Sequence, residues 1–134
     1  MAIQSLSVQP IDHITLVVAD LEASRHFYVE LLGMVEVDRP AFNFPGAWFQ
    51  AGNTQIHATV GDEHSGLPGW GDRKVGKLSR GHHFAFQVDD AVEAARFLEQ
   101  NGIEIKSGPK QRPDGPTQIY FYDPDEHLVE LFSV

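Results

Sequence analysis

The chain has 134 residues, which is enough for one compact domain with a sizeable core and requires no second fold. It carries 19 acidic and 10 basic side chains, and the resulting formal net charge of −9 disfavours contact with nucleic acid or an anionic membrane. It contains no cysteine, so disulfides and thiolate metal sites are excluded, and any metal must be bound by imidazole and carboxylate.

One small unit occurs twice along the chain. The tracts HITLVVAD, residues 13–20, and HFAFQVDD, residues 83–90, each predict a strand that opens with histidine and leads to an aspartate seven positions later. Each aspartate is followed by a helical pattern that ends at a glycine, Gly33 or Gly102. Three strand-like runs follow each helix: 34–39, 47–52 and 54–60 in the first unit, and 103–108, 118–123 and 127–134 in the second.

The sequence therefore predicts an α+β fold in a single domain, 1–134, built from two βαβββ modules. Module one covers about residues 11–60 and module two about residues 81–134. The segment between them, 61–80, is rich in glycine and charge, which predicts an exposed connection. Alternation along the strands separates helix-facing apolar rows from the opposite face. Four potential metal ligands fall on that opposite, concave face: His13, His57, His83 and Glu130.

Three tracts resemble the vicinal oxygen chelate superfamily: DHITLVVADLEASRHFYVELLGM (12–34), GHHFAFQVDD (81–90) and YFYDPDEHLVELF (120–132). This superfamily includes glyoxalase I, fosfomycin-resistance thiol transferases, bleomycin-resistance proteins and extradiol dioxygenases. The resemblance covers nearly the whole chain and implies a U-shaped, eight-stranded mixed sheet around a metal cup. It also implies one divalent ion, zinc, nickel, iron, manganese or cobalt, bound by His13, His57, His83 and Glu130. His57 is the least specific of the four and is either a ligand or a neighbour of the bound substrate.

The resemblance implies a glyoxalase-like lyase or isomerase acting on a small substrate chelated through vicinal oxygens. In that reaction Glu130 would be both ligand and base, and Thr15 and Tyr120 would assist. Glyoxalase I carries a glutamate where this chain has His57. Three alternatives therefore remain open: an extradiol-type dioxygenase, a fosfomycin-type thiol transferase, and a nonenzymatic binding protein of the bleomycin-resistance kind.

Residues outside the ligand set give further expectations. Phe44, Trp48 and Phe49 are expected to form pocket walls, with packing in the sheet as the alternative. Lys110 and Arg112 are expected to attract an anionic substrate, whereas His127 is predicted to be solvated in a turn. Open strand edges and the size of relatives predict a homodimer, whose cup combines His13 and His57 of one chain with His83 and Glu130 of the other. With no secretion signal and no bilayer-spanning run, we expect a cytoplasmic location.

Overall fold

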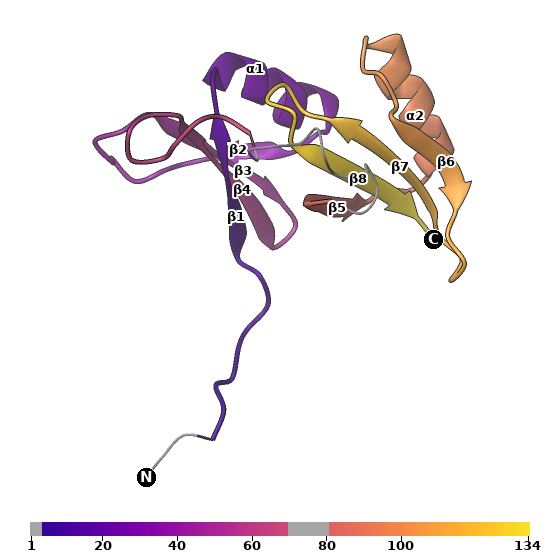
Figure 1. Ribbon diagram of the computed structural model, residues 1–134, viewed down its shortest axis with the longest axis horizontal. Helices are drawn as coiled ribbons and strands as arrows, with labels where there is room; N and C mark the ends of the chain where they lie inside the picture. The colour runs from indigo at the N-terminus through magenta and orange to yellow at the C-terminus, as the bar shows by residue number, and fades with distance from the viewer. Residues whose placement is uncertain (1–3, 70–80) are drawn as a thin grey trace.

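The computed structural model describes residues 4–69 and 81–134 and has the predicted α+β architecture (Figure 1). Module one contains β1 (His13–Val18), α1 (Leu21–Arg25), a π-helical turn η1 (His26–Leu31), β2 (Val35–Val37), β3 (Gly46–Ala51) and β4 (Thr54–Val60). Module two contains β5 (His83–Gln87), α2 (Ala91–Gln100), β6 (Ser107–Gln111), β7 (Thr117–Tyr122) and β8 (Leu128–Ser133). Both modules thus have the predicted βαβββ order.

The eight strands are divided within one chain between two four-stranded mixed sheets. The strand orders are β1-β4-β3-β2 and β5-β8-β7-β6. The pairs β1–β4 and β5–β8 are parallel, and the remaining pairs are antiparallel. Because β1 and β5 each occupy the edge of a sheet, both strands that open with a predicted histidine ligand have an unpaired side within the described residues.

The two helices begin and end where the sequence predicts. Asp20 and Asp90 cap them, because each side chain accepts hydrogen bonds from backbone N–H groups of the first helical turn. Gly33 and Gly102 follow the helix ends with φ of +78° and +82°, a conformation that favours glycine. The first helix widens into the π-helical turn η1, which buries two neighbouring aromatic residues, Phe27 and Tyr28.

The helix-facing rows of both sheets pack into one shared core. Leu16 and Val18 of β1 belong to the same buried cluster as Phe121 of β7 and Val129 of β8. The rings of Phe27 and Phe121, one from each module, are 5.9 Å apart between centroids. Because successive strand residues point to opposite faces, the predicted ligand rows of both modules point away from this shared core.

A buried polar network ties the turn between β7 and β8 to module one. Asp123 Oδ2 accepts hydrogen bonds from the Tyr28 hydroxyl (2.6 Å) and from His127 Nδ1 (2.8 Å). Next in the turn, Asp125 Oδ1 accepts from the backbone N–H of Ala19 at 3.0 Å. Burial raises the pKa of Tyr28 well above its ordinary value, and the charge of Asp123 raises it further. His127, which bonds the same carboxylate, is fully buried, so the prediction of a solvated histidine is wrong.

The strand predicted at 103–108 begins later, at Ser107. The backbone N–H of Ile103 donates to Leu98 O, so the start of the predicted strand instead closes α2. The register of β6 against β7 then shifts at a bulge beside Gly108. A Cβ on Gly108 would lie 2.3 Å from Gln118 O, so the close approach of the two strands requires glycine there.

The N-terminal segment extends away from the rest of the chain (Figure 1) and exposes Leu6, Val8 and Ile11. In the connection between the modules, Asp62 organises a turn bridged to Gly66. The rest of the predicted exposed connection, 70–80, lies outside the described residues. Among the residues described, no helix has the length and apolar character required to cross a membrane.

Candidate metal and substrate site

The first half-site is the pair His13 and His57 on the concave face of module one. Their imidazole rings stack with centroids 3.8 Å apart and planes 13° from parallel. The indole of Trp48 on β3 stacks on His57 in turn, at 4.0 Å and 2°. Strand register explains the second stack, because Trp48 and His57 are direct cross-strand neighbours on β3 and β4. His13 is a diagonal neighbour of His57, since its direct partner on β4 is Gln55.

Neighbouring groups fix which imidazole nitrogen carries the proton. Asp12 Oδ2 accepts from His13 Nδ1 at 2.8 Å, which leaves the lone pair on Nε2. Gln55 Oε1 accepts from His57 Nε2 at 2.8 Å, which leaves the lone pair on Nδ1. Burial lowers the pKa of His57, and the neighbouring His13 lowers it further. Such hydrogen-bonded imidazoles, each with a free ring nitrogen, are typical of metal-ligating histidines.

The second half-site is the pair His83 and Glu130 on module two. His83 Nδ1 donates to Gly81 O at 2.9 Å, and His83 Nε2 lies 3.2 Å from Glu130 Oε1. The same Oε1 accepts from the Tyr120 hydroxyl at 2.9 Å, and burial raises the pKa of Tyr120 to about 12, with the Glu130 carboxylate adding to the shift. Glu130 is only 4% exposed, yet its Oε2 has no hydrogen-bond partner among the described residues; Arg112 Nη1 is 3.7 Å away.

The contact between His83 Nε2 and Glu130 Oε1 can hold a positive charge, either a proton or a metal ion. With the proton of neutral His83 on Nδ1, the lone pair of Nε2 faces a carboxylate oxygen at 3.2 Å. A proton or a metal ion between these atoms would relieve the repulsion. Glu130 Oε2 is a second buried acceptor, without a hydrogen-bond partner in the described part of the chain, and it remains available to an ion or to a substrate proton. The donor set, imidazole nitrogen plus carboxylate oxygen, therefore fits a divalent transition metal.

The four predicted ligands form two pairs, one on each module. Within residues 4–69 and 81–134, no three histidine, aspartate or glutamate side chains are placed to share one ion. The two pairs stay separate because the modules share one core and both ligand-bearing faces point away from that core. Each pair alone supplies too few ligands for a closed site, and each leaves room for additional donors.

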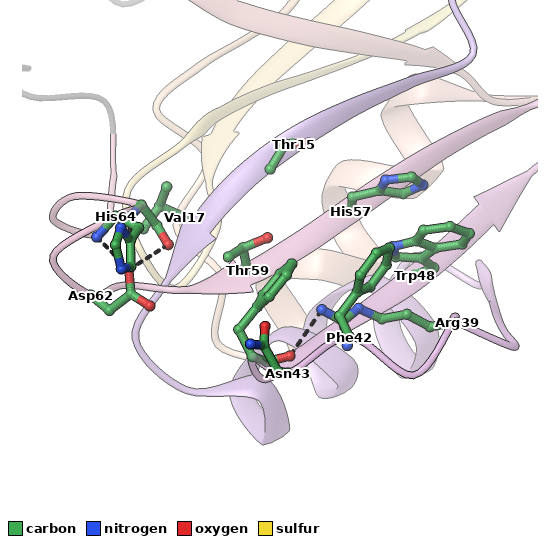
Figure 2. Close-up of a pocket in the computed structure, with 12 residues that line it drawn as sticks. Thr15, Val17, Arg39, Phe42, Asn43, Trp48, His57, Thr59, Asp62 and His64 are labelled. Atoms are coloured by element: carbon green, nitrogen blue, oxygen red, sulfur yellow. Dashed lines mark hydrogen bonds between the residues drawn. The ribbon is translucent and has the colours of Figure 1, made fainter.

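A cavity of about 790 Å³ lies beside the first half-site on module one. Figure 2 shows His57 and Trp48 together on one side of it and Thr59 between them and Asp62. The lining includes His57 and three further predicted site residues, Thr15, Phe44 and Trp48, together with residues that were not predicted, among them Arg39 and Phe42. The sequence signal for the latter pair is a cation placed just before an aromatic run in DRPAFNF.

Phe49 does not line this cavity and is instead fully buried in the core, where its ring packs 5.8 Å from that of Tyr28. It neighbours Trp48 on β3, so the pleat directs it to the opposite, helix-facing side. Lys110 is exposed on the edge strand β6 and Arg112 is paired with Asp114 at 2.6 Å. Of these two predicted substrate cations, Arg112 therefore belongs to the second half-site and neither lines the cavity of module one.

Similarity to known proteins agrees with this class of fold and site. A model of the Glyoxalase/Bleomycin resistance protein/Dioxygenase superfamily matches residues 10–131, so the chain belongs to this superfamily. Glyoxylase I 4 of Arabidopsis thaliana is 26% identical over 94% of this chain and 71% of its own. Glutathione transferase FosA of Serratia marcescens is 32% identical, covering 92% of this chain and 80% of its own.

Lactoylglutathione lyase of Escherichia coli O157:H7 is 31% identical, with 90% of both chains covered. Among solved structures, a glyoxalase family protein from Bacillus anthracis superposes with a TM-score of 0.72 at 28% identity, covering 97% of this chain and 98% of that one. Enzymes with different reactions thus share this fold and comparable identity with the chain.

Proposed function

We propose that the protein is a metal-dependent enzyme of glyoxalase type, a lyase or isomerase acting on a small molecule that presents two vicinal oxygens. His13, His57, His83 and Glu130 would hold one divalent ion. When bound, the ion would act as a Lewis acid that stabilises negative charge developing on the substrate oxygens. The observation that carries the proposal is the buried Glu130 carboxylate, whose Oε1 lies 3.2 Å from His83 Nε2 and whose Oε2 has no hydrogen-bond partner among the described residues.

The remaining roles follow from the hydrogen bonds of Glu130. Tyr120 donates to Oε1, and Oε2 is the oxygen left without a hydrogen-bond donor among the described residues. In an isomerisation, Oε2 would take a proton from one substrate carbon and return it to the adjacent carbon. The exposed Thr15 hydroxyl, beside His57 in the cavity lining, would donate a hydrogen bond to a substrate oxygen.

We further propose that the cup is completed by a second copy of the chain. The first half-site of one chain would meet the second half-site of the other, giving two cups per dimer. The edge positions of β1 and β5 support this arrangement, because each offers an unpaired side to another strand. The exposed apolar side chains of Leu6 and Val8 on the extended N-terminal segment also favour burial against a partner.

The direct test combines metal content with turnover. The purified protein is loaded with nickel or zinc, and the metal retained after desalting is measured. The loaded protein is then incubated with methylglyoxal and glutathione, and thioester formation is followed by absorbance. We expect one ion per chain and turnover in the parent, both lost in Glu130→Gln and both retained in Glu99→Gln, the same change at an exposed position on α2. Absence of turnover with every divalent metal offered would remove the glyoxalase assignment.

A thiol transferase acting on an epoxide is the second candidate. The presence of His57 favours this reaction. Glyoxalase I has a glutamate at that position, so the proposed ligand set here contains one carboxylate, Glu130, and not two for exchanging a substrate proton. The 32% identity to glutathione transferase FosA supports the same alternative. Incubation of the metal-loaded protein with fosfomycin and either glutathione or cysteine, followed by mass spectrometry, would detect the thiol adduct. An adduct without methylglyoxal turnover would assign the thiol transferase reaction.

A further inference from the structure

Arg39 is a cation in the lining of the module-one cavity that forms no ion pair with a carboxylate of the described residues. Its guanidinium lies 4.9 Å from the ring centroid of Phe42 and 4.8 Å from that of Phe44, and Nη2 donates to Phe44 O at 3.0 Å. Among the described residues no aspartate or glutamate forms an ion pair with it, although the chain carries a formal net charge of −9. The two rings stack on each other with centroids 5.2 Å apart, and the guanidinium packs beside both of them, which keeps donors available for an external anion.

The position of Arg39 depends on a glycine in the neighbouring strand. A Cβ on Gly46 would lie 2.8 Å from Arg39 Nη2 and 2.6 Å from Ala58 O. The guanidinium therefore occupies space that a side chain at the start of β3 would take. Since the guanidinium packs against the backbone of Gly46 and beside the rings of Phe42 and Phe44, less side-chain entropy is lost when it binds a ligand.

The cavity is charged asymmetrically, with Arg39 near the aromatic residues and Asp62 across from it. Figure 2 shows Arg39 beside Phe42 and Trp48, with Asp62 on the other side of the cavity. The carboxylate of Asp62 is already engaged, because its Oδ1 accepts from the backbone N–H groups of its own turn. The ring centroids of Phe42 and Trp48 are 6.4 Å apart and their planes are tilted by 49°, so two aromatic rings lie next to each other beside the guanidinium.

We propose that this cavity binds a small molecule with a flat aromatic ring and a carboxylate or similar anionic group. The ring would pack on Phe42 and Trp48, and the anion would accept hydrogen bonds from Arg39. The cavity volume, about 790 Å³, is in the range of small-molecule sites. This inference rests on the proposed function, since it names the substrate class for the same site: the cavity is also lined by His57.

The test uses the fluorescence of Trp48 as a reporter within the cavity. Trp70, the other tryptophan of the chain, is changed to phenylalanine so that only Trp48 emits. With a chelator present, the Trp70→Phe protein is titrated with 4-nitrobenzoate and with 4-nitrobenzamide, matched flat rings with and without negative charge, which quench indole fluorescence on contact. We expect saturable quenching by both and about tenfold tighter binding of the carboxylate, the effect of one charge-assisted hydrogen bond.

Two further variants in the same background assign the preference to one side chain. Arg39→Met keeps an unbranched apolar stem and should make the two ligands bind equally. Arg96→Met removes the same charge from the exposed ion pair with Glu93 on α2 and should leave the preference unchanged. Non-saturable quenching, equal affinities in the Trp70→Phe protein, or a preference that survives Arg39→Met would each overturn the proposal. Because no metal is present, failure of metal binding or turnover does not affect this result, and the two proposals fail independently.

Discussion

Subunit complementation gives the sharpest test of a cup that is shared between two chains. One variant carries His13→Ala and His57→Ala, which removes the first half-site. The other carries His83→Ala and Glu130→Gln, which removes the second half-site. In a dimer of either variant, each cup receives one damaged half, so neither preparation should retain metal or turn over substrate.

When the two variants are combined, the fraction of metal binding and activity that returns follows from the way in which the half-sites pair. When equal amounts of the variants are unfolded together and refolded, random pairing makes about half of the dimers mixed. Each mixed dimer has one cup built from two intact halves and one built from two damaged halves. The mixture should therefore regain about a quarter of the parent metal content, and about a quarter of its activity, relative to the same mass of protein.

Metal content after desalting is the primary measurement, and native mass spectrometry confirms that mixed dimers have formed. Mixing the folded variants without dissociation serves as the control and should restore nothing on the same timescale. A cup that closes within one chain predicts no recovery at all, because every chain in the mixture is damaged. No recovery in the presence of mixed dimers, or a monomeric mass by light scattering at micromolar concentration, would refute the shared cup.

Three further predictions concern individual side chains. Tyr28→Phe removes a buried hydrogen bond to Asp123 that links the modules and should lower the free energy of unfolding in urea by about 2 kcal/mol. Tyr120→Phe leaves Glu130 without its phenolic donor and should weaken metal binding by about tenfold in competition with a chromophoric chelator. Burial raises the pKa of Asp125, so its carboxylate form destabilises the fold at any pH above its folded pKa, and that cost disappears as the pH falls through it. Asp125→Asn should therefore be more stable than the parent at pH 7 and equal to it below the ordinary pKa of 3.8.

Tyr122→Phe is the matched control for both tyrosine variants, because Tyr122 is half-buried at the end of β7 and should tolerate the change. If Tyr28→Phe lowers the free energy of unfolding no more than Tyr122→Phe does, the role assigned to Tyr28 is wrong. If Tyr120→Phe weakens metal binding no more than Tyr122→Phe does, the role assigned to Tyr120 is wrong. For Asp125→Asn, the amide oxygen still accepts the backbone hydrogen bond made by Oδ1. If Asp125→Asn were less stable than the parent at pH 7, burial of the carboxylate would not be what raises the pKa of Asp125.

The sequence predicts those features that depend on local geometry. Alternation along a strand has a period of two, so it assigned His13, His57, His83 and Glu130 to faces that the structure confirms are opposite the helix-facing rows. The caps at Asp20 and Asp90 are equally local, since Asp20 accepts from the backbone N–H of Glu22, and Asp90 accepts from those of Val92 and Glu93.

Features that depend on contacts between distant segments were not predicted. His127 is buried because Asp123 and Tyr28, which is 95 positions away from Asp123, surround a common polar network. The position of the Arg39 guanidinium depends on the rings of Phe42 and Phe44 and on the missing side chain of Gly46 in the next strand. No periodic pattern in the sequence reports such contacts, because they arise only when the turns and modules pack.

The shared core also explains why one chain does not close its own cup. To bring both ligand faces together, a chain would have to separate its modules and expose Leu16, Val18, Phe121 and Val129, each now at most 1% exposed. Burial of a large apolar side chain contributes about 1.5–3 kcal/mol, so exposing four would cost about 6–12 kcal/mol. That cost is comparable to the whole stability of a typical domain. In the proposed dimer, a second copy would complete the cup without this cost, because each chain would keep its own core intact.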